Sequence, residues 1–166
     1  MKILLVCLGN ICRSPTAEAA VREALAQRGL SDRVEVDSAG TGSWHLGDPP
    51  DSRMREAAAT AGLRLDGEAR QVTTADFEHY DLLVAMDRAN ARDLRALAPD
   101  EAARAKVRLF RDFDPDADSD EVPDPYYGGR RGFARVVEIC RSGAAGLVDH
   151  LADEFDDRGT HRDRPA

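Results

Sequence analysis

The sequence predicts a single-domain α/β fold of three α/β/α layers, with a four-stranded parallel sheet in the middle and a phosphate-binding loop after the first strand. Short apolar runs with the length of buried strands alternate with segments of helical periodicity. A crossing from strand through helix to strand is right-handed and makes the strands parallel. The length of 166 residues suits one domain with its own core.

The first elements place a loop at a helix N-terminus. A strand is expected over residues 3–6 (ILLV), and the stretch 7–15 (CLGNICRSP) leads into a helix over 16–28. Ser14 is the expected N-cap, since Pro15 suits a first helical position. Free backbone N–H groups and the positive end of the helix dipole make this loop a predicted anion site.

The other elements follow from the same patterns. They are a strand over 34–37, a loop over 38–50, a helix over 50–62, a strand over 80–85, a helix over 88–97, a strand over 107–109 and a helix over 130–155. The last helix carries an apolar stripe that includes Cys140, and Gly143 and Gly146 either weaken its middle or permit close packing. We expect the domain to span residues 1–157 and residues 158–166 to form a flexible tail.

Composition excludes several classes of function. A formal net charge of −8 argues against a general nucleic-acid binder. No apolar stretch is long enough for a membrane span or a signal peptide, and three cysteines do not make a secreted disulfide framework, so a cytoplasmic location is expected. No cofactor and no metal are expected, because the histidines lack ligand spacing. The acidic run 114–121 lacks the Gly and Glu of a calcium loop and is interpreted as a solvated loop.

Cys7 and Arg13 stand at the two ends of the predicted anion loop, with five residues between them. A loop of this length can wrap a tetrahedral phosphate, with the sulfur below the phosphorus and the guanidinium on two oxygens. A helix N-terminus and a nearby cation favour the thiolate form of a cysteine. Gly9 and Asn10 suit unusual backbone angles, and Ser14 can donate a hydrogen bond to the sulfur. A lone cysteine would instead be interpreted as a buried core residue.

The stretch 7–15 resembles the phosphate-binding loop of the low-molecular-weight protein tyrosine phosphatases. The stretch 124–129 (DPYYGG) resembles the general-acid loop of that family, and 37–45 and 85–90 resemble family segments in the same order. The resemblance spans about residues 2–157. It implies that phosphotyrosine is hydrolysed in two steps through a phosphocysteine, with Cys7 as nucleophile, Arg13 on the phosphate and Asp124 as general acid.

The resemblance also assigns the surroundings of the site. Its phosphate-binding loop comprises Leu8, Gly9, Asn10, Ile11, Cys12, Arg13 and Ser14, and its aromatic walls are Trp44, Tyr126 and Tyr127. Gly67 stands where several family members have a histidine that helps to hold the loop asparagine, so Ser38 is expected to hold Asn10. Cys12 either forms a reversible disulfide with Cys7 or only fills the loop interior. Asp87 is interpreted as a helix N-cap. The implied partner is a phosphotyrosine-containing protein, with inhibition by phosphate-like oxyanions and with neither nucleic acid nor membrane.

Three alternatives stay open from the sequence. Arsenate reduction uses a similar loop but needs a relay of further thiols, and Cys140 is expected to be buried on a distant helix. Phosphoarginine hydrolysis is a second alternative, although some relatives with that activity carry Thr where this chain has Ile11. A non-catalytic phosphoprotein-binding module is the third, and it would need neither a nucleophile nor an acid.

Overall fold

The computed structural model describes residues 1–162, with side chains described through residue 159. Its sheet has the order β2-β1-β3-β4, and each pairing is parallel. The strands are β1 (Lys2–Cys7), β2 (Glu35–Gly40), β3 (Leu82–Ala85) and β4 (Val107–Leu109). The predicted α/β fold with a four-stranded parallel sheet is confirmed.

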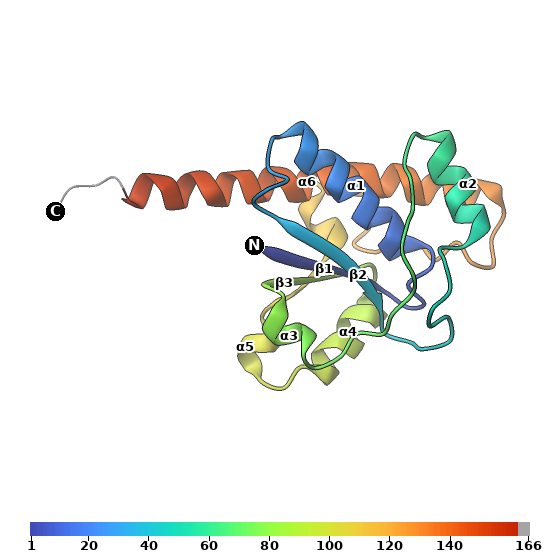
Figure 1. Cartoon of the computed structure of the whole chain (residues 1–166), viewed down its shortest axis with the longest axis horizontal. Helices are drawn as coiled ribbons and strands as arrows, with labels where there is room; N and C mark the ends of the chain where they lie inside the picture. The colour runs from blue at the N-terminus through green and yellow to red at the C-terminus, as the bar shows by residue number, and fades with distance from the viewer. Residues whose placement is uncertain (163–166) are drawn as a thin grey trace.

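Helices cover both faces of the sheet. They are α1 (Arg13–Gln27), α2 (Ser52–Thr60), α3 (Asp76–His79), α4 (Arg88–Leu97), α5 (Glu101–Arg104), a 3-10 helix η1 (Phe110–Phe113) and α6 (Arg130–Arg162). Figure 1 shows α1, α2 and α6 on one side of the sheet and α3, α4 and α5 on the other. The short helices α3, α5 and η1 were not predicted, because about one turn gives no helical periodicity in a sequence.

The central strand β1 explains why two cores form. Its side chains alternate between the faces, so Ile3 and Leu5 pack beneath α1, α2 and α6. Leu4 and Val6 lie on the opposite face, beneath α3 and α4. All four side chains are fully buried, as expected for the middle of a parallel sheet. The strand ends at Cys7, paired with Gly40 at the carboxyl end of β2.

The first helix begins earlier than the sequence predicts. Its N-cap is Cys12, and the backbone N–H of Thr16 donates to the Cys12 carbonyl at 3.3 Å. The expectation that Ser14 is the N-cap is therefore wrong. The physical reason is that the Ser14 hydroxyl turns toward the sulfur of Cys7, at 3.0 Å, and so serves the loop rather than the helix end.

The glycines of α6 permit close packing. A Cβ atom on Gly146 would lie 2.0 Å from the carbonyl oxygen of Phe113, and one on Gly143 would lie 2.3 Å from the Phe110 ring. Both glycines therefore let η1 approach the helix backbone directly. Of the two explanations that the sequence allowed, close packing is the one observed.

The end of α6 differs from the expected tail. The helix continues through residues 158–162, and Glu154 forms ion pairs one turn away in each direction, with His150 and Arg158. Residues 163–166 of the predicted tail lie outside the described residues. Within residues 1–162, none of the helices is both long enough and apolar enough to cross a membrane.

Candidate active site

A cleft of about 370 Å³ opens at the carboxyl end of β1. This is the edge where a parallel sheet binds its ligands. The lining residues come from three segments of the chain: Cys7, Leu8, Gly9, Ile11, Cys12, Arg13, Trp44, His45, Asp124, Tyr126 and Tyr127. The structure therefore brings together the predicted nucleophile, the predicted phosphate-binding arginine, the predicted acid and the predicted aromatic walls.

The Cys7 sulfur lies at the floor of this cleft, and the residue is 2% exposed. The backbone N–H of Asn10 donates a hydrogen bond to the sulfur at 3.3 Å. The Ser14 hydroxyl lies 3.0 Å away, closer than its other acceptor, the Ala39 carbonyl at 3.4 Å. Because Asn10 Nδ2 donates to the same hydroxyl at 2.9 Å, the Ser14 proton is free to point at the sulfur. These donors stabilise negative charge on the sulfur.

Asn10 holds the loop in its unusual shape. Its φ of 57° lies in the left-handed region, where Asn is tolerated better than most residues. Its side-chain amide donates to Ser14 and to Ser38, the latter at 3.0 Å. Its Oδ1 accepts a hydrogen bond from the backbone N–H of Arg70 at 3.0 Å. Ser38 thus lies where the sequence expected it, and Arg70 is a partner that the sequence did not indicate.

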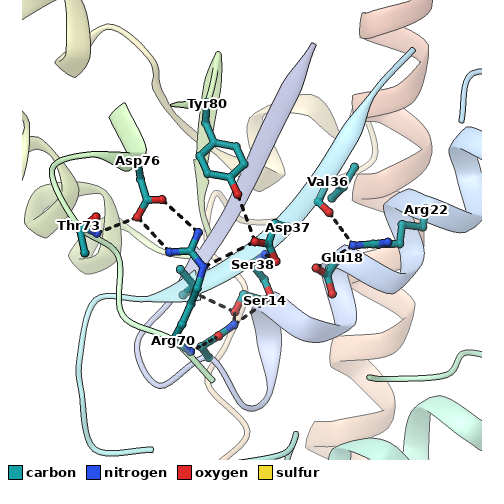
Figure 2. A network of polar contacts seen from close by, with 12 residues as sticks. Ser14, Glu18, Arg22, Val36, Asp37, Ser38, Arg70, Thr73, Asp76 and Tyr80 are labelled. Atoms are coloured by element: carbon teal, nitrogen blue, oxygen red, sulfur yellow. Dashed lines mark hydrogen bonds and ion pairs between the residues drawn. The ribbon is translucent and has the colours of Figure 1, made fainter. Parts of the chain in front are cut away.

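The Arg70 side chain fixes the segment that supplies this backbone donor (Figure 2). Its two Nη atoms donate to the carboxylate oxygens of Asp76 at 3.1 Å each, and its Nε lies 3.6 Å from Asp37. Asp76 also accepts from the backbone of Thr73, and the Tyr80 hydroxyl donates to Asp37 at 3.2 Å. The forked geometry of a guanidinium on a carboxylate fixes orientation as well as distance.

Glu18 extends the same network along α1 (Figure 2). Its carboxylate pairs with Arg22 at 3.2 Å, and Arg22 donates to the Val36 carbonyl of the edge strand β2 at 2.6 Å. Burial raises the pKa of Glu18 to about 7, with Arg22 acting in the opposite direction and the nearby Asp37 charge acting in the same direction as burial. Glu18 therefore titrates near neutral pH.

The Arg13 side chain is buried, with 3% of it exposed, and is fixed by several acceptors. Its Nη1 donates to Asp87 Oδ2 at 2.6 Å and to the Val122 carbonyl at 3.1 Å, while Nη2 lies 3.6 Å from Asp124 Oδ2. Although burial lowers the pKa of Arg13, the negative charge at Cys7 and the hydrogen bond to Asp87 raise it above its usual value. The guanidinium is thus a fixed cation beside the sulfur.

Asp87 does more than the sequence interpretation assigned to it. Its Oδ1 accepts from the backbone N–H of Asn90 at 2.7 Å, so it is the N-cap of α4. Its Oδ2 orients Arg13. The sequence signal was its place directly after β3, at the edge where Cys7 also lies.

Asp124 lies at the mouth of the cleft, where 43% of its side chain is exposed. Its Oδ1 accepts from the backbone N–H of Tyr126 at 3.1 Å, which is the Asx-turn geometry. The turn leaves Oδ2 directed toward Arg13. The residue can therefore reach a group bound above Cys7 and exchange protons with solvent.

Aromatic side chains form the rim. Trp44 is 73% exposed and packs on Gly42, where a Cβ atom would lie 2.0 Å from the indole ring. Tyr127 is 96% exposed and stands nearly perpendicular to Tyr126, with ring centroids 4.9 Å apart. His45 also lines the cleft, 6.0 Å from the Tyr126 ring, and was not singled out as a site residue from the sequence.

The other two cysteines are buried free thiols. Burial, followed by the charges of Asp51 and Cys7, raises the pKa of Cys12 to about 12. Burial also raises the pKa of Cys140. Cys140 is not distant, as the sequence suggested, because its sulfur lies 3.9 Å from the Arg13 carbonyl. It packs behind the loop because α6 covers α1, and it is not among the residues that line the cleft.

The acidic run 114–121 is not simply solvated. Asp114 is buried, Asp118 pairs with Arg111 and Arg135, and Asp120 pairs with Arg88. The sequence interpretation failed here because the pairing arginines come from other parts of the chain. Within residues 1–162, no three His, Cys, Asp or Glu side chains gather in a way that could hold a metal ion.

Comparisons with known proteins agree with this geometry. Residues 2–157 match the family model described as low molecular weight phosphotyrosine protein phosphatase. A low molecular weight protein-tyrosine-phosphatase from Streptomyces coelicolor is 46% identical over 159 residues, which are 95% of this chain and 97% of that protein. The structure of a protein tyrosine phosphatase from Entamoeba histolytica superposes with a TM-score of 0.90 at 41% identity, covering 93% of this chain and 99% of that one. The structure of Vibrio vulnificus Wzb in complex with benzylphosphonate has a TM-score of 0.78 at 29% identity, covering 90% and 97%.

Proposed function

Because the chain belongs to the low molecular weight phosphotyrosine protein phosphatase family, we propose that it hydrolyses phosphotyrosine in proteins through a phosphocysteine on Cys7. The observation that carries this proposal is the Cys7 sulfur, hydrogen-bonded by two loop donors at the floor of a cleft that also contains Arg13 and Asp124. The matched range supports residues 1–157 as the catalytic domain.

In the first step the Cys7 thiolate attacks phosphorus, and the bond from phosphorus to the aryl oxygen breaks. The loop N–H groups and Arg13 bind the equatorial oxygens, where charge develops. The leaving phenolate takes a proton from the carboxylic acid of Asp124. This transfer matters because a phenol has a pKa of about 10, so unprotonated phenolate is a poor leaving group.

In the second step the Asp124 carboxylate takes a proton from a water molecule, whose oxygen attacks the phosphocysteine. The bond between sulfur and phosphorus breaks, which returns the thiolate and releases inorganic phosphate. The Ser14 hydroxyl, 3.0 Å from the sulfur, stabilises the departing thiolate. Asp124 therefore acts as acid and then as base at one position.

The walls of the cleft support an aryl phosphate as substrate. Trp44 and Tyr126 present aromatic rings on which a phenyl ring can pack. Phosphate-like oxyanions should inhibit by occupying the loop, and the benzylphosphonate bound to Vibrio vulnificus Wzb is an anion of this kind. The free thiols support a cytoplasmic location, and the net charge of −8 supports a protein rather than a nucleic-acid partner. A reversible disulfide between Cys12 and Cys7 stays a prediction.

Phosphate release from a simple aryl phosphate at mildly acidic pH tests the proposal. The wild-type enzyme should turn over with and without a chelator, and Cys7→Ser should lose all measurable turnover, since a serine hydroxyl is not ionised here. Asp124→Ala should retain phosphate binding but lose about 10²-fold or more in rate. Wild-type rates in the serine variant would refute Cys7 as the nucleophile.

A further inference from the structure

The acidic run 114–121 comes directly before the segment that carries Asp124. Three of its side chains, Asp118, Asp120 and Glu121, are bound by arginine side chains or backbone from outside the run. Surface ion pairs of this kind usually add little stability. One of these arginines, however, is buried and donates a hydrogen bond to the backbone of the run.

That residue is Arg111, in η1, whose side chain is 6% exposed. Its Nη1 donates to the Glu121 carbonyl at 2.9 Å and its Nη2 donates to Asp118 Oδ1 at 2.7 Å. The other oxygen of Asp118 accepts from Arg135 of α6 at 3.0 Å. A buried guanidinium that donates to a main-chain carbonyl fixes the path of the chain, and solvent screens it less than an exposed pair.

A second anchor comes from the start of α4. Arg88 binds both oxygens of Asp120 at 2.8 Å, and its backbone N–H donates to Glu121 Oε2 at 2.9 Å. Arg88 follows Asp87, which orients Arg13. The phosphate-binding arginine and the acidic run are therefore fixed to the same helix end.

The chain is held again at Val122, which is buried. Its N–H donates to the Met86 carbonyl at 2.8 Å, and its carbonyl accepts from Arg13 at 3.1 Å. Asp124 follows two residues later at the rim of the cleft. The position of its carboxyl group thus depends on how firmly residues 118–122 are held.

We propose that Arg111 is a positioning residue, which holds the loop of Asp124 over the cleft through the Glu121 carbonyl and Asp118. This inference rests on the proposed function, in which Asp124 is the general acid. A displacement of about 1 Å in a reacting group can cost about 10²-fold in rate. Loosening the anchor should therefore affect the proton-transfer step and leave phosphate binding intact.

The dependence on the leaving group separates positioning from a general structural role. An aryl phosphate with a strongly acidic phenol needs little help from an acid, whereas one with a weakly acidic phenol needs a well-placed proton donor. We would measure kcat/KM over a series of aryl phosphates for Arg111→Met, Arg111→Lys and Asp118→Ala. Asp118 is exposed, so its variant should fold even where loss of the buried arginine does not. Thermal unfolding and the inhibition constant of inorganic phosphate would be recorded for each variant.

We expect Asp118→Ala and Arg111→Met to lose about tenfold in kcat/KM for the weakly acidic phenols and less than about twofold for the strongly acidic ones. Phosphate inhibition should stay within about twofold of wild type, and Arg111→Lys should recover part of the loss. Arg92→Gln is the matched control, because Arg92 pairs with Asp93 on the exposed side of α4. It should leave the whole series unchanged.

Asp124→Ala is the reference for the general acid. If this variant lacks the leaving-group dependence, the acid assignment fails and the inference fails with it. Suppose that the loss of kcat/KM in Asp124→Ala depends on the leaving group, while the Asp118 and Arg111 variants lose the same factor for every aryl phosphate or lose nothing. In that case only the positioning role is overturned. If Arg111→Met does not fold, the Asp118→Ala series alone decides.

Discussion

Replacing Asp87 by Asn isolates the contact that orients Arg13, the proposed phosphate-binding arginine. Asn and Asp are equally good N-caps, so the cap on α4 is kept. The change removes the negative charge that lies 2.6 Å from Arg13 Nη1. The Val122 carbonyl remains as the other acceptor of that nitrogen, which leaves the guanidinium partly held.

The size of the effect follows from the burial of the pair. Removing one partner of a fully buried ion pair costs about 3–5 kcal/mol, whereas a hydrogen bond to a charged group is worth about 1.5–3 kcal/mol. The amide of the Asp87→Asn variant still offers an oxygen, and Asp87 is partly exposed, so the lower range applies. We expect a loss of about 2 kcal/mol in the free energy of unfolding, and a fall in Tm of roughly 4–8 °C.

The kinetic effect should be of similar size. A guanidinium free to rotate binds the equatorial oxygens less well, so kcat/KM should fall about 10- to 100-fold and phosphate should inhibit more weakly. Steady-state kinetics on an aryl phosphate and thermal unfolding measure the two effects. Asp100→Asn is the matched control, because Asp100 caps α5 with the same bond to a backbone N–H, at 2.8 Å, and lies outside the cleft. Wild-type kcat/KM and phosphate inhibition in Asp87→Asn would refute this reasoning.

Three further changes give measurable outcomes. Because burial raises the pKa of Glu18 to about 7, from a usual value of 4.5, the folded state binds its proton more tightly and the free energy of unfolding should fall as pH rises between these values. The difference between the free energies of unfolding at pH 4.5 and pH 7.5, measured by urea unfolding, should be smaller in Glu18→Gln than in wild type by up to about 3 kcal/mol. Gly146→Ala should destabilise by about 1–3 kcal/mol through its contact with η1, whereas Gly159→Ala, with open space around it, should be neutral or stabilising by up to about 1 kcal/mol in thermal unfolding. Since Cys12 holds its proton with a pKa of about 12, iodoacetate should label Cys7, as located by peptide mass, and Cys12→Ser should keep activity within about threefold.

The sequence predicted that Cys7 and Arg13 share one loop because all of the information for this loop is local. An apolar strand, a five-residue spacer and a helix N-terminus place Cys7 and Arg13 at one site through the rules of chain geometry. The four parallel strands and the long helices followed from periodicity in the same way. The prediction that Ser14 is the N-cap was wrong because a serine hydroxyl can bond to several kinds of group. Here it contacts the sulfur of Cys7.

Contacts between distant segments were not predictable in this way. Arg13 and Asp87 are 74 positions apart, and two of the arginines that bind the acidic run come from α4 and α6. A chain with 23 basic and 31 acidic residues offers many pairings of opposite charge, and sequence patterns do not select among them. Only the folded backbone determines which of these pairs are buried, and burial decides which of them orient a reacting group.

The loop asparagine is held although position 67 is a glycine. By the resemblance, a histidine that several family members carry at this position helps to hold the asparagine, whereas Gly67 has a φ of 90°, a backbone angle in which a side chain would be strained. In this chain the Oδ1 of Asn10 accepts a hydrogen bond from the backbone N–H of Arg70. That donor is fixed because the Arg70 guanidinium is bound by Asp76 and lies beside Asp37. The left-handed Asn10 therefore depends on two carboxylates, which fix the arginine whose main chain makes the contact.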